Sequence, residues 1–242
     1  MGGDADLTRH RPRARAFAMM AAMTTLARPP AALSCAELFT TWLPEAFARA
    51  RAAGAQPPDA RLRVELAGDG GGAWLVTVAG GELAIARVDA DGGADADAAL
   101  VLRQSVADFR AAIWGEDGHE PLIPPELDLT AAITGQARVP TAALAQVRGT
   151  LAIEIAGFGD RTWSLAVALG GAATPAATVA FDLPTLAALR AGTLPVAQAF
   201  FAGKIAVTGD VPWLMQVGMS LAAGGLGGGL GGPGGAPGRG MA

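Results

Sequence analysis

An internal repeat is the feature that most constrains how this chain can fold. The segments Leu62–Gly70 and Trp74–Val78 return as Leu151–Gly159 and Trp163–Val167, with a constant offset and no gap between them. Each copy has the pattern of a strand, a glycine turn and a second strand that begins with tryptophan. Because a repeat of this length reports a duplicated structural unit, the sequence predicts two related α+β units.

The repeat divides the 242 residues into four parts. We expect a leader over 1–33, a first unit over 34–148, a second unit over 149–222 and a flexible glycine-rich tail over 223–242. The tail carries too much glycine to recover its ordering entropy by burial. The prediction is therefore two small fused domains with a disordered segment at each end.

The leader leaves the cellular location open. Arg11, Arg13 and Arg15 precede a short apolar stretch at 16–23, as in the first part of a signal peptide. No apolar run reaches the length that a membrane span needs. We expect a cytoplasmic protein with a disordered leader, and an exported or lipid-anchored form and a start codon placed too early remain as alternatives.

Apolar periodicity and turn residues predict the elements of both units. Ser34 and Glu37 form the pattern of a capping box, and Pro44 is expected to kink or split the helix that follows. In the second unit a short connection at 170–175 replaces the stretch 81–97 of the first, so its third strand is expected to be missing or shortened. Ser105 is expected to cap the helix that begins there. The predicted helices are 36–50, 105–114, 141–147, 184–191, 196–201 and 211–221, and the predicted strands are 62–66, 74–78, 83–88, 98–103, 151–155, 163–169, 177–181 and 204–207.

The chain offers few residues that could perform catalysis. Its histidines are His10 and His119, and its single cysteine is Cys35. The acidic loop with Asp89, Asp91, Asp95 and Asp97 resembles a calcium loop but lacks the bidentate glutamate, so a solvated loop is expected. A net charge of −4 without a basic stripe argues against nucleic acid as a partner. We therefore expect no enzyme activity, no metal and no cofactor.

Apolar side chains gather in the last third of the second unit. Ordinary core packing accounts for most of them, yet Trp213, Met215 and Met219 lie in a terminal helix that precedes the flexible tail. Methionine adapts its shape to variable apolar ligands. An apolar cavity with few polar groups is the typical form of a lipid site. This segment is therefore the first candidate for binding.

A motif in the same segment resembles a known family. Gly192, Pro195, Ala199-Phe200, Gly203-Lys204 and Gly209-Asp210 follow one another as in the signature of the sterol carrier protein type 2 family. The second strand of that family, which begins with tryptophan, resembles Trp163–Val167. The resemblance covers most of 149–222. The first unit resembles the front half of the family, and 133–139 is a degenerate copy of the Gly-Lys strand.

The resemblance implies an α+β fold made of two degenerate units of this type, each a small twisted sheet with helices on one face. It implies non-catalytic binding or transfer of a fatty acyl chain, a sterol or a similar lipid in an apolar tunnel, with transient membrane contact. The residues expected at the lipid site are Trp163, Leu165, Leu189, Phe200, Phe201, Ile205, Val207, Trp213, Met215 and Met219.

Other hypotheses remain at this point. An accessory protein that scaffolds a lipid or quinone biosynthetic enzyme would have a filled core and an exposed apolar patch. An enzyme would place Cys35 or His119 inside a pocket. For any of these functions, the truncated connection at 170–175 and the degenerate strand at 133–139 suggest that the units complete each other around one apolar interior.

Overall fold

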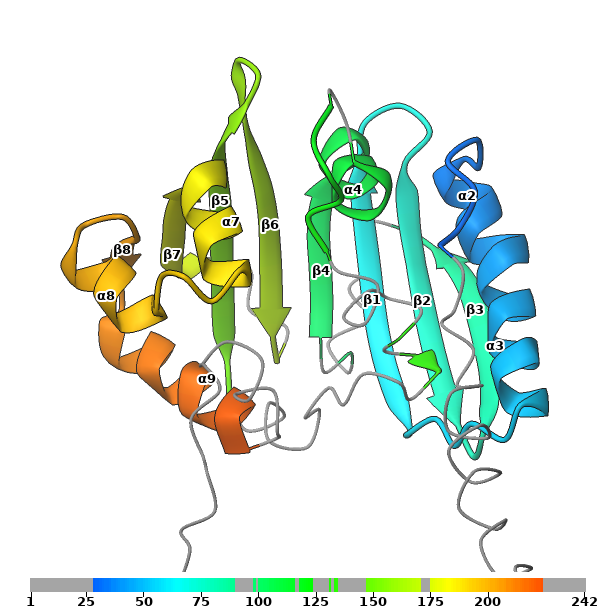
Figure 1. Cartoon of the computed structure of the whole chain (residues 1–242). Coiled ribbons are helices and arrows are strands. Elements are labelled where there is room, and N and C mark those ends of the chain that lie inside the picture. The colour runs from blue at the N-terminus through cyan, green and yellow to red at the C-terminus, as the bar shows by residue number, and fades with distance from the viewer. Residues whose placement is uncertain are drawn as a thin grey trace, which may run out of the picture.

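In the computed structural model, the residues described are 28–89, 98, 100–115, 118–123, 131, 133–134, 147–170 and 175–223. Within them the strands form one eight-stranded sheet in the order β3-β2-β1-β4-β6-β5-β7-β8, and helices pack against it (Figure 1). This confirms the α+β class. The strands are β1 (Ala60–Ala67), β2 (Gly72–Ala79), β3 (Glu82–Val88), β4 (Leu100–Ser105), β5 (Gly149–Phe158), β6 (Arg161–Leu169), β7 (Pro175–Asp182) and β8 (Ala206–Gly209).

The helices are assigned to the two halves of the sheet by their position in the chain. The first unit has α2 (Cys35–Glu37), the π-helix η1 (Leu38–Trp42), α3 (Leu43–Ala52) and α4 (Val106–Trp114). The second unit has α7 (Leu183–Arg190), α8 (Val196–Phe201) and α9 (Val211–Ala223).

The repeat is visible in the sheet as two sets of three strands with the same order and directions. In β2-β1-β4 and in β6-β5-β7 the first two strands are antiparallel and the last two are parallel. Strand β3 lies antiparallel to β2, and β4 takes the corresponding place beside β6. At the other end of each set, β8 lies antiparallel to β7 in the second unit, and β6 takes the corresponding position beside β4 of the first unit. Each unit thus supplies the edge strand that its neighbour lacks.

The pairing of β4 with β6 joins the units into one sheet. It runs from Leu100 opposite Leu169 to Arg103 opposite Ala166. Beside β6, the place that a third strand of the second unit would take is held by β4. The expected two small sheets are therefore continuous with each other.

The two hairpins differ in register although the repeat has no gap. Val64 pairs with Trp74 in the first unit, whereas Ile155, and not Ile153, pairs with Trp163 in the second. The shift is two residues, because the second hairpin closes through a tighter turn with an irregularity near Phe158. A shift of two keeps every side chain on the same face of the sheet, so matching residues of the two units still face the same way.

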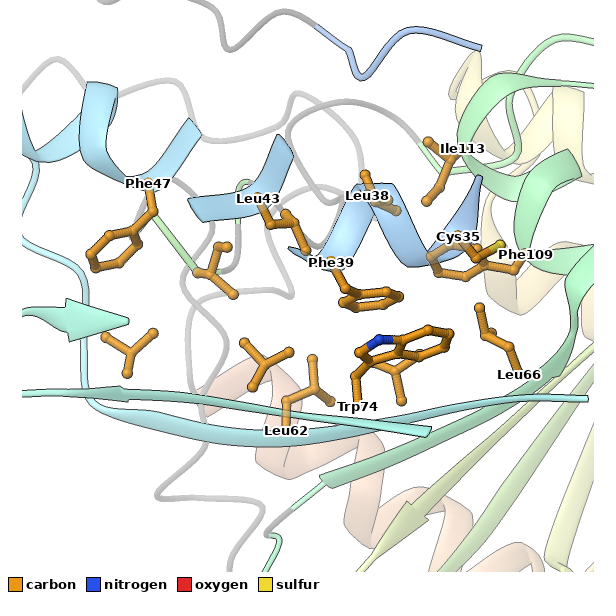
Figure 2. Close-up of a cluster of buried hydrophobic side chains, with 14 residues drawn as sticks. Cys35, Leu38, Phe39, Leu43, Phe47, Leu62, Leu66, Trp74, Phe109 and Ile113 are labelled. Carbon is orange, nitrogen blue, oxygen red and sulfur yellow. The ribbon is translucent and has the colours of Figure 1, made fainter. Parts of the chain in front are cut away.

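A helical segment covers one face of the first unit and fills its core (Figure 2). Ser34 caps it through the predicted capping box with Glu37. Pro44 lies in the first turn of α3, directly after the π-helix, so the wider turn accommodates the proline without breaking the helical path. Phe39 is fully buried and stacks on Trp74, with ring centroids 4.5 Å apart. The segment therefore closes the face of β1 and β2.

Helix α4 lies between the units and packs on both. Phe109 and Ile113 belong to the core of the first unit, whereas Ala111 and Ala112 pack with Ile155 and its neighbours in the second. The predicted cap is present, since the Asp108 backbone N–H donates to Ser105 Oγ over 3.0 Å.

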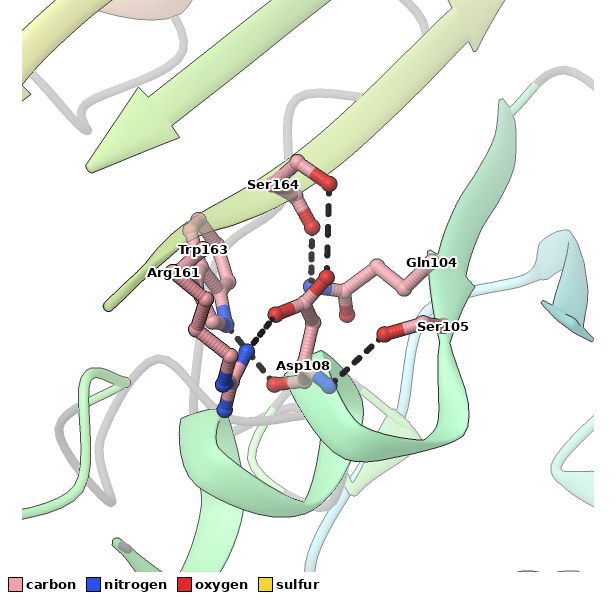
Figure 3. A network of polar contacts seen from close by, with 6 residues as sticks. All are labelled: Gln104, Ser105, Asp108, Arg161, Trp163 and Ser164. Atoms are coloured by element: carbon pink, nitrogen blue, oxygen red, sulfur yellow. Dashed lines mark hydrogen bonds and ion pairs between the residues drawn. The ribbon is translucent and has the colours of Figure 1, made fainter. Parts of the chain in front are cut away.

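Polar contacts from Asp108 tie α4 to β6 (Figure 3). The Asp108 carboxylate forms an ion pair with Arg161 and accepts a hydrogen bond from Ser164 Oγ at 3.3 Å. Its backbone carbonyl accepts a hydrogen bond from Trp163 Nε1 at 2.7 Å. Because Asp108 is 5% exposed, this largely buried network fixes the second unit to α4 of the first.

The segment 28–33 is bound to α4 by hydrogen bonds from long side chains. Arg28 Nη1 donates to the Ile113 carbonyl at 2.9 Å, and Trp114 Nε1 donates to the Pro29 carbonyl at 2.7 Å. Arg110 Nη1 donates to the Leu33 carbonyl at 2.8 Å. The described fold thus begins at residue 28, before the expected unit boundary at 34.

Several expectations lie outside the described residues. They are residues 1–27 of the leader, the tail from 224, the aspartates at 91, 95 and 97, most of the degenerate strand at 133–139 and all but the last residue of the helix expected at 141–147.

Candidate functional site

A row of apolar side chains crosses the helix-covered face of the second unit. Leu165 on β6 lies opposite Ile153 on β5, which lies opposite Val179 on β7, which in turn lies opposite Val207 on β8. All of these side chains are half-buried. This half-open row therefore presents a continuous apolar strip that the protein's own side chains cover only in part.

The matching positions of the first unit are closed. Val64 and Val76, which the repeat aligns with Ile153 and Leu165, are each 1% exposed. Phe39 and other side chains of the segment 35–52 pack over them. Residues that the repeat aligns are thus covered by a helical segment in the first unit and half-buried in the second.

Two clusters bound the half-open row. On one side Trp163, Ile155 and Phe158 are buried against α4, and α7 contributes Leu183 and other partly buried side chains. On the other side, α9 contributes Val217 to a cluster that includes Val147 and Leu169 and is extended by Val167 and Trp213. Ile153 and Leu165 of the row pack against the first cluster and Val167 packs against the second, and each of these side chains stays half-buried.

Trp213 anchors α9 over the lower end of the sheet. Its Nε1 donates to the Arg148 carbonyl at 2.7 Å. Its ring lies against Gly149, so closely that a Cβ added to this glycine would lie 2.6 Å from two ring atoms. Asp210 begins the helix by accepting the Trp213 backbone N–H at 2.9 Å. The position of α9 therefore depends on a tryptophan and a glycine that meet without space between them.

Gly203 and Gly209 of the motif both have a positive φ angle. Their φ angles are +68° and +94°. An added Cβ at Gly203 meets nothing within 4 Å, whereas one at Gly209 would lie 2.3 Å from the Ala176 carbonyl oxygen. Only glycine adopts such angles at low cost, so both residues shape the chain around β8.

The structure places the ten residues expected at a lipid site in three environments. Leu165 and Val207 belong to the half-open row, and Leu189 and Trp213 are also half-buried. Trp163 and Ile205 are buried, at 3% and 9% exposure. The remaining residues are exposed on α8 and α9: Phe200 (46%), Phe201 (86%), Met215 (64%) and Met219 (65%).

Sequence reasoning did not single out Ile153, Val179, Leu151 and Val167 as site residues. Their alternation with polar or small residues predicted strands, but which strand lies beside which is set by long-range pairing. The repeat could have identified Ile153, because it aligns Ile153 with Val64, which the helical segment 35–52 covers. No helix as long was predicted ahead of the strands of the second unit, so Ile153 would be expected to have less cover.

The residues that could perform chemistry lie apart from this row. Cys35 is buried in the core of the first unit, and burial raises the pKa of its thiol. His119 is exposed, and its ring lies 5.2 Å from that of Phe158. Among the residues that the structure describes, no histidine, cysteine or acidic side chains cluster as a metal site would require. In the same part of the chain, no helix has the length and apolar character to cross a membrane.

Comparison with known proteins gives a match to one family. No curated protein matches the chain. Among solved structures, sterol carrier protein 2 like 2 from Aedes aegypti is 25% identical, over 31% of this chain and 74% of that chain, with a TM-score of 0.26. Sterol carrier protein domain 2 of Helicoverpa armigera is 22% identical, over 34% of this chain and 74% of that chain, with a TM-score of 0.27.

The family match falls on the second unit. Residues 132–222 match the model of the SCP-2 sterol transfer family. This segment contains the whole of 149–222, the part in which the glycine-lysine motif resembled the sterol carrier proteins. Residues 132–222 of this chain are thus similar to the SCP-2 sterol transfer family.

Proposed function

We propose that this protein is a non-catalytic carrier that binds an apolar lipid over the half-open row of its second unit. The observation that carries the proposal is the contrast between matching positions: Val64 and Val76 are sealed, whereas Ile153 and Leu165 are half-buried. Apolar surface left open on a sheet face gains free energy when an apolar ligand covers it. The ligand would occupy the place that a helix fills in the first unit.

The geometry of the row favours an extended or flat apolar ligand. It crosses four neighbouring strands, β6, β5, β7 and β8, and three interstrand spacings amount to about 14 Å. That length suits an acyl chain or a sterol ring system. The match of residues 132–222 to the SCP-2 sterol transfer family supports the same class of ligand.

A pair of repeat-matched substitutions tests whether the row is open. Ile153→Phe adds volume at the row, whereas Val64→Phe adds volume at the matching position of the sealed core. Overpacking a filled core costs about 1–3 kcal/mol, so Val64→Phe should lower the melting temperature and Ile153→Phe should not. Equal destabilisation by both variants would contradict an open row.

Ligand binding is measured with the same variants. A fluorescent fatty acid and a fluorescent sterol are titrated into the wild-type protein, into Ile153→Phe and into Glu154→Gln, a control on the exposed face of the same strand. We expect saturable binding that Ile153→Phe weakens at least tenfold and that Glu154→Gln leaves unchanged. If Ile153→Phe binds the ligands as tightly as the wild type does, the ligand does not lie over the half-open row.

A scaffolding function is the second candidate, because apolar side chains are exposed on α8 and α9. A scaffold would hold an enzyme on that surface and have no need of a ligand. It predicts no saturable lipid binding to the purified protein, and a stable complex with a biosynthetic enzyme that substitutions on α8 or α9 disrupt.

A further inference from the structure

The exposed apolar side chains of this protein are concentrated on two helices. Among the described residues, every large hydrophobic side chain that is exposed belongs to α8 or α9. We call this surface the α8–α9 face, and it consists of Val196, Phe200, Phe201, Val211, Met215 and Met219. Scattered exposed apolar residues are normal, whereas a concentration of them marks a surface that contacts something apolar.

Helix α9 has apolar side chains on opposite sides. Val217 is 4% exposed and packs on the sheet, together with Trp213. Val211, Met215 and Met219 lie one helical turn apart and are exposed. A helix that is apolar all round is normally covered all round or lies in a membrane environment, but α9 is covered on its sheet side alone.

The few charged residues near the α8–α9 face indicate what kind of partner this face fits. Between residues 191 and 223 the charged residues are Lys204 and Asp210, and Asp210 accepts a hydrogen bond at the start of α9. Lys204 is exposed and follows the Phe200-Phe201 pair closely in the chain. An apolar surface with a single exposed lysine and almost no acidic groups complements a bilayer, where aromatic rings and methionines enter the acyl region and lysine meets anionic headgroups.

We propose that the α8–α9 face is the surface by which this protein docks on a phospholipid bilayer. Helix α8 lies beside β7 and β8, which carry Val179 and Val207 of the half-open row, and α9 begins there and runs along the lower end of the sheet (Figure 1). The proposal rests on the proposed function, since a carried lipid has to pass between a bilayer and the row. Docking by α8 and α9 would give the lipid a short path between the bilayer and the row that avoids water.

Vesicle flotation tests the docking. The full-length protein is mixed with vesicles of phosphatidylcholine, with and without phosphatidylserine, and the bound fraction is measured for the wild type, Phe201→Ser, Met215→Ser with Met219→Ser, and Gln216→Ser. Gln216 is an exposed polar residue of α9, so its substitution controls for a change in the helix that removes no apolar surface. None of the changed residues belongs to the half-open row.

The docking surface predicts that the wild type and Gln216→Ser float equally. Phe201→Ser and the double methionine variant should each lower the ratio of bound to free protein about tenfold, because each removes apolar area equal to a large side chain. Lys204→Ala should reduce binding to phosphatidylserine vesicles only. Gln216→Ser should bind the fluorescent fatty acid in solution as the wild type does.

Two results would overturn the docking surface. One is equal flotation of the wild type and the apolar variants. The other is a wild-type dimer in sedimentation velocity that does not float and that the apolar variants dissociate, which would assign the α8–α9 face to a second copy of the chain. Flotation as predicted, together with a failure to bind any apolar ligand, would refute the carrier function and leave the docking surface standing.

Discussion

Replacing Gly149 with alanine should release α9 from the sheet. The added Cβ would lie 2.6 Å from Trp213 Cε2 and Cζ2 and 2.8 Å from Nε1, well inside contact distance. The φ angle of Gly149, +145°, is also one that residues with a side chain rarely adopt. The ring therefore has to move, and its hydrogen bond to the Arg148 carbonyl breaks.

The expected cost of Gly149→Ala is about 2–4 kcal/mol. Backbone strain contributes roughly 1–3 kcal/mol, and the lost hydrogen bond contributes about 1 kcal/mol. Gly203→Ala is the matched control, because Gly203 also has a positive φ, +68°, but nothing lies within 4 Å of its added Cβ. This control should cost only about 1 kcal/mol.

Chemical denaturation and amide hydrogen exchange measure the two variants. Gly149→Ala should lower the free energy of unfolding more than Gly203→Ala does, and it should also speed exchange along α9 selectively. If the two variants lose equal stability and the protection of α9 is unchanged, the close contact between Gly149 and Trp213 does not hold α9 in place.

Four further predictions concern stability. Asp108→Ala should cost about 1–3 kcal/mol, measured by urea unfolding, because its ion pair and hydrogen bond to β6 are lost; an unchanged midpoint would contradict the link between the units. Phe39→Ala should cost about 3–5 kcal/mol by the same method, since this ring is fully buried; a loss below about 1 kcal/mol would show that the core does not depend on it. Hydrogen bonds at the start of α7 lower the pKa of Asp182, so the ionised carboxylate stabilises the folded state above about pH 4, and this stabilisation is lost as the pH falls through the folded-state pKa. Asp182→Asn should therefore make the free energy of unfolding less dependent on pH in acid, and an unchanged dependence would contradict this role of Asp182. Fragments 34–148 and 149–223 should each be aggregated or molten alone and soluble when co-expressed, because the pairing of β4 with β6 is cut, whereas two sharp independent melts would show autonomous domains.

Local features of the fold could be predicted from the sequence because local forces set them. The capping box at Ser34, the cap at Ser105 and the helix at 196–201 are where the sequence placed them. Hydrophobic periodicity and capping residues act over a few neighbours. The repeat predicted two related units for the same reason, since each copy carries the same local pattern.

Long-range pairing could not be predicted in this way. The contact of β4 with β6, and the shift of two residues between the hairpins, depend on how strands meet across the sheet. The segment 28–33 resembled a leader because it has no periodic pattern, and its hydrogen bonds come from distant side chains such as Trp114. Sequence alone does not fix such contacts.

The candidate site also combines features that the sequence predicts with features that depend on long-range strand pairing. Apolar crowding in the last third pointed to the second unit, in which the proposed site lies, and the expected lipid-site residues included Leu165 and Val207. It could not distinguish the covered side of α9 from its exposed side, because apolar residues such as Met215 and Val217 occur on both. The neighbours of Leu165 in the row, Ile153 and Val179, became visible only through strand register.

Native mass spectrometry of the purified full-length protein tests the carrier function most directly. The protein is isolated without detergent, its intact mass is measured under gentle and then activating conditions, and the released material is extracted and identified. The account predicts a bound species that corresponds to one lipid, that activation removes, and that Ile153→Phe greatly reduces. A bare protein mass in every preparation, together with no uptake of any added fatty acid or sterol, would contradict it.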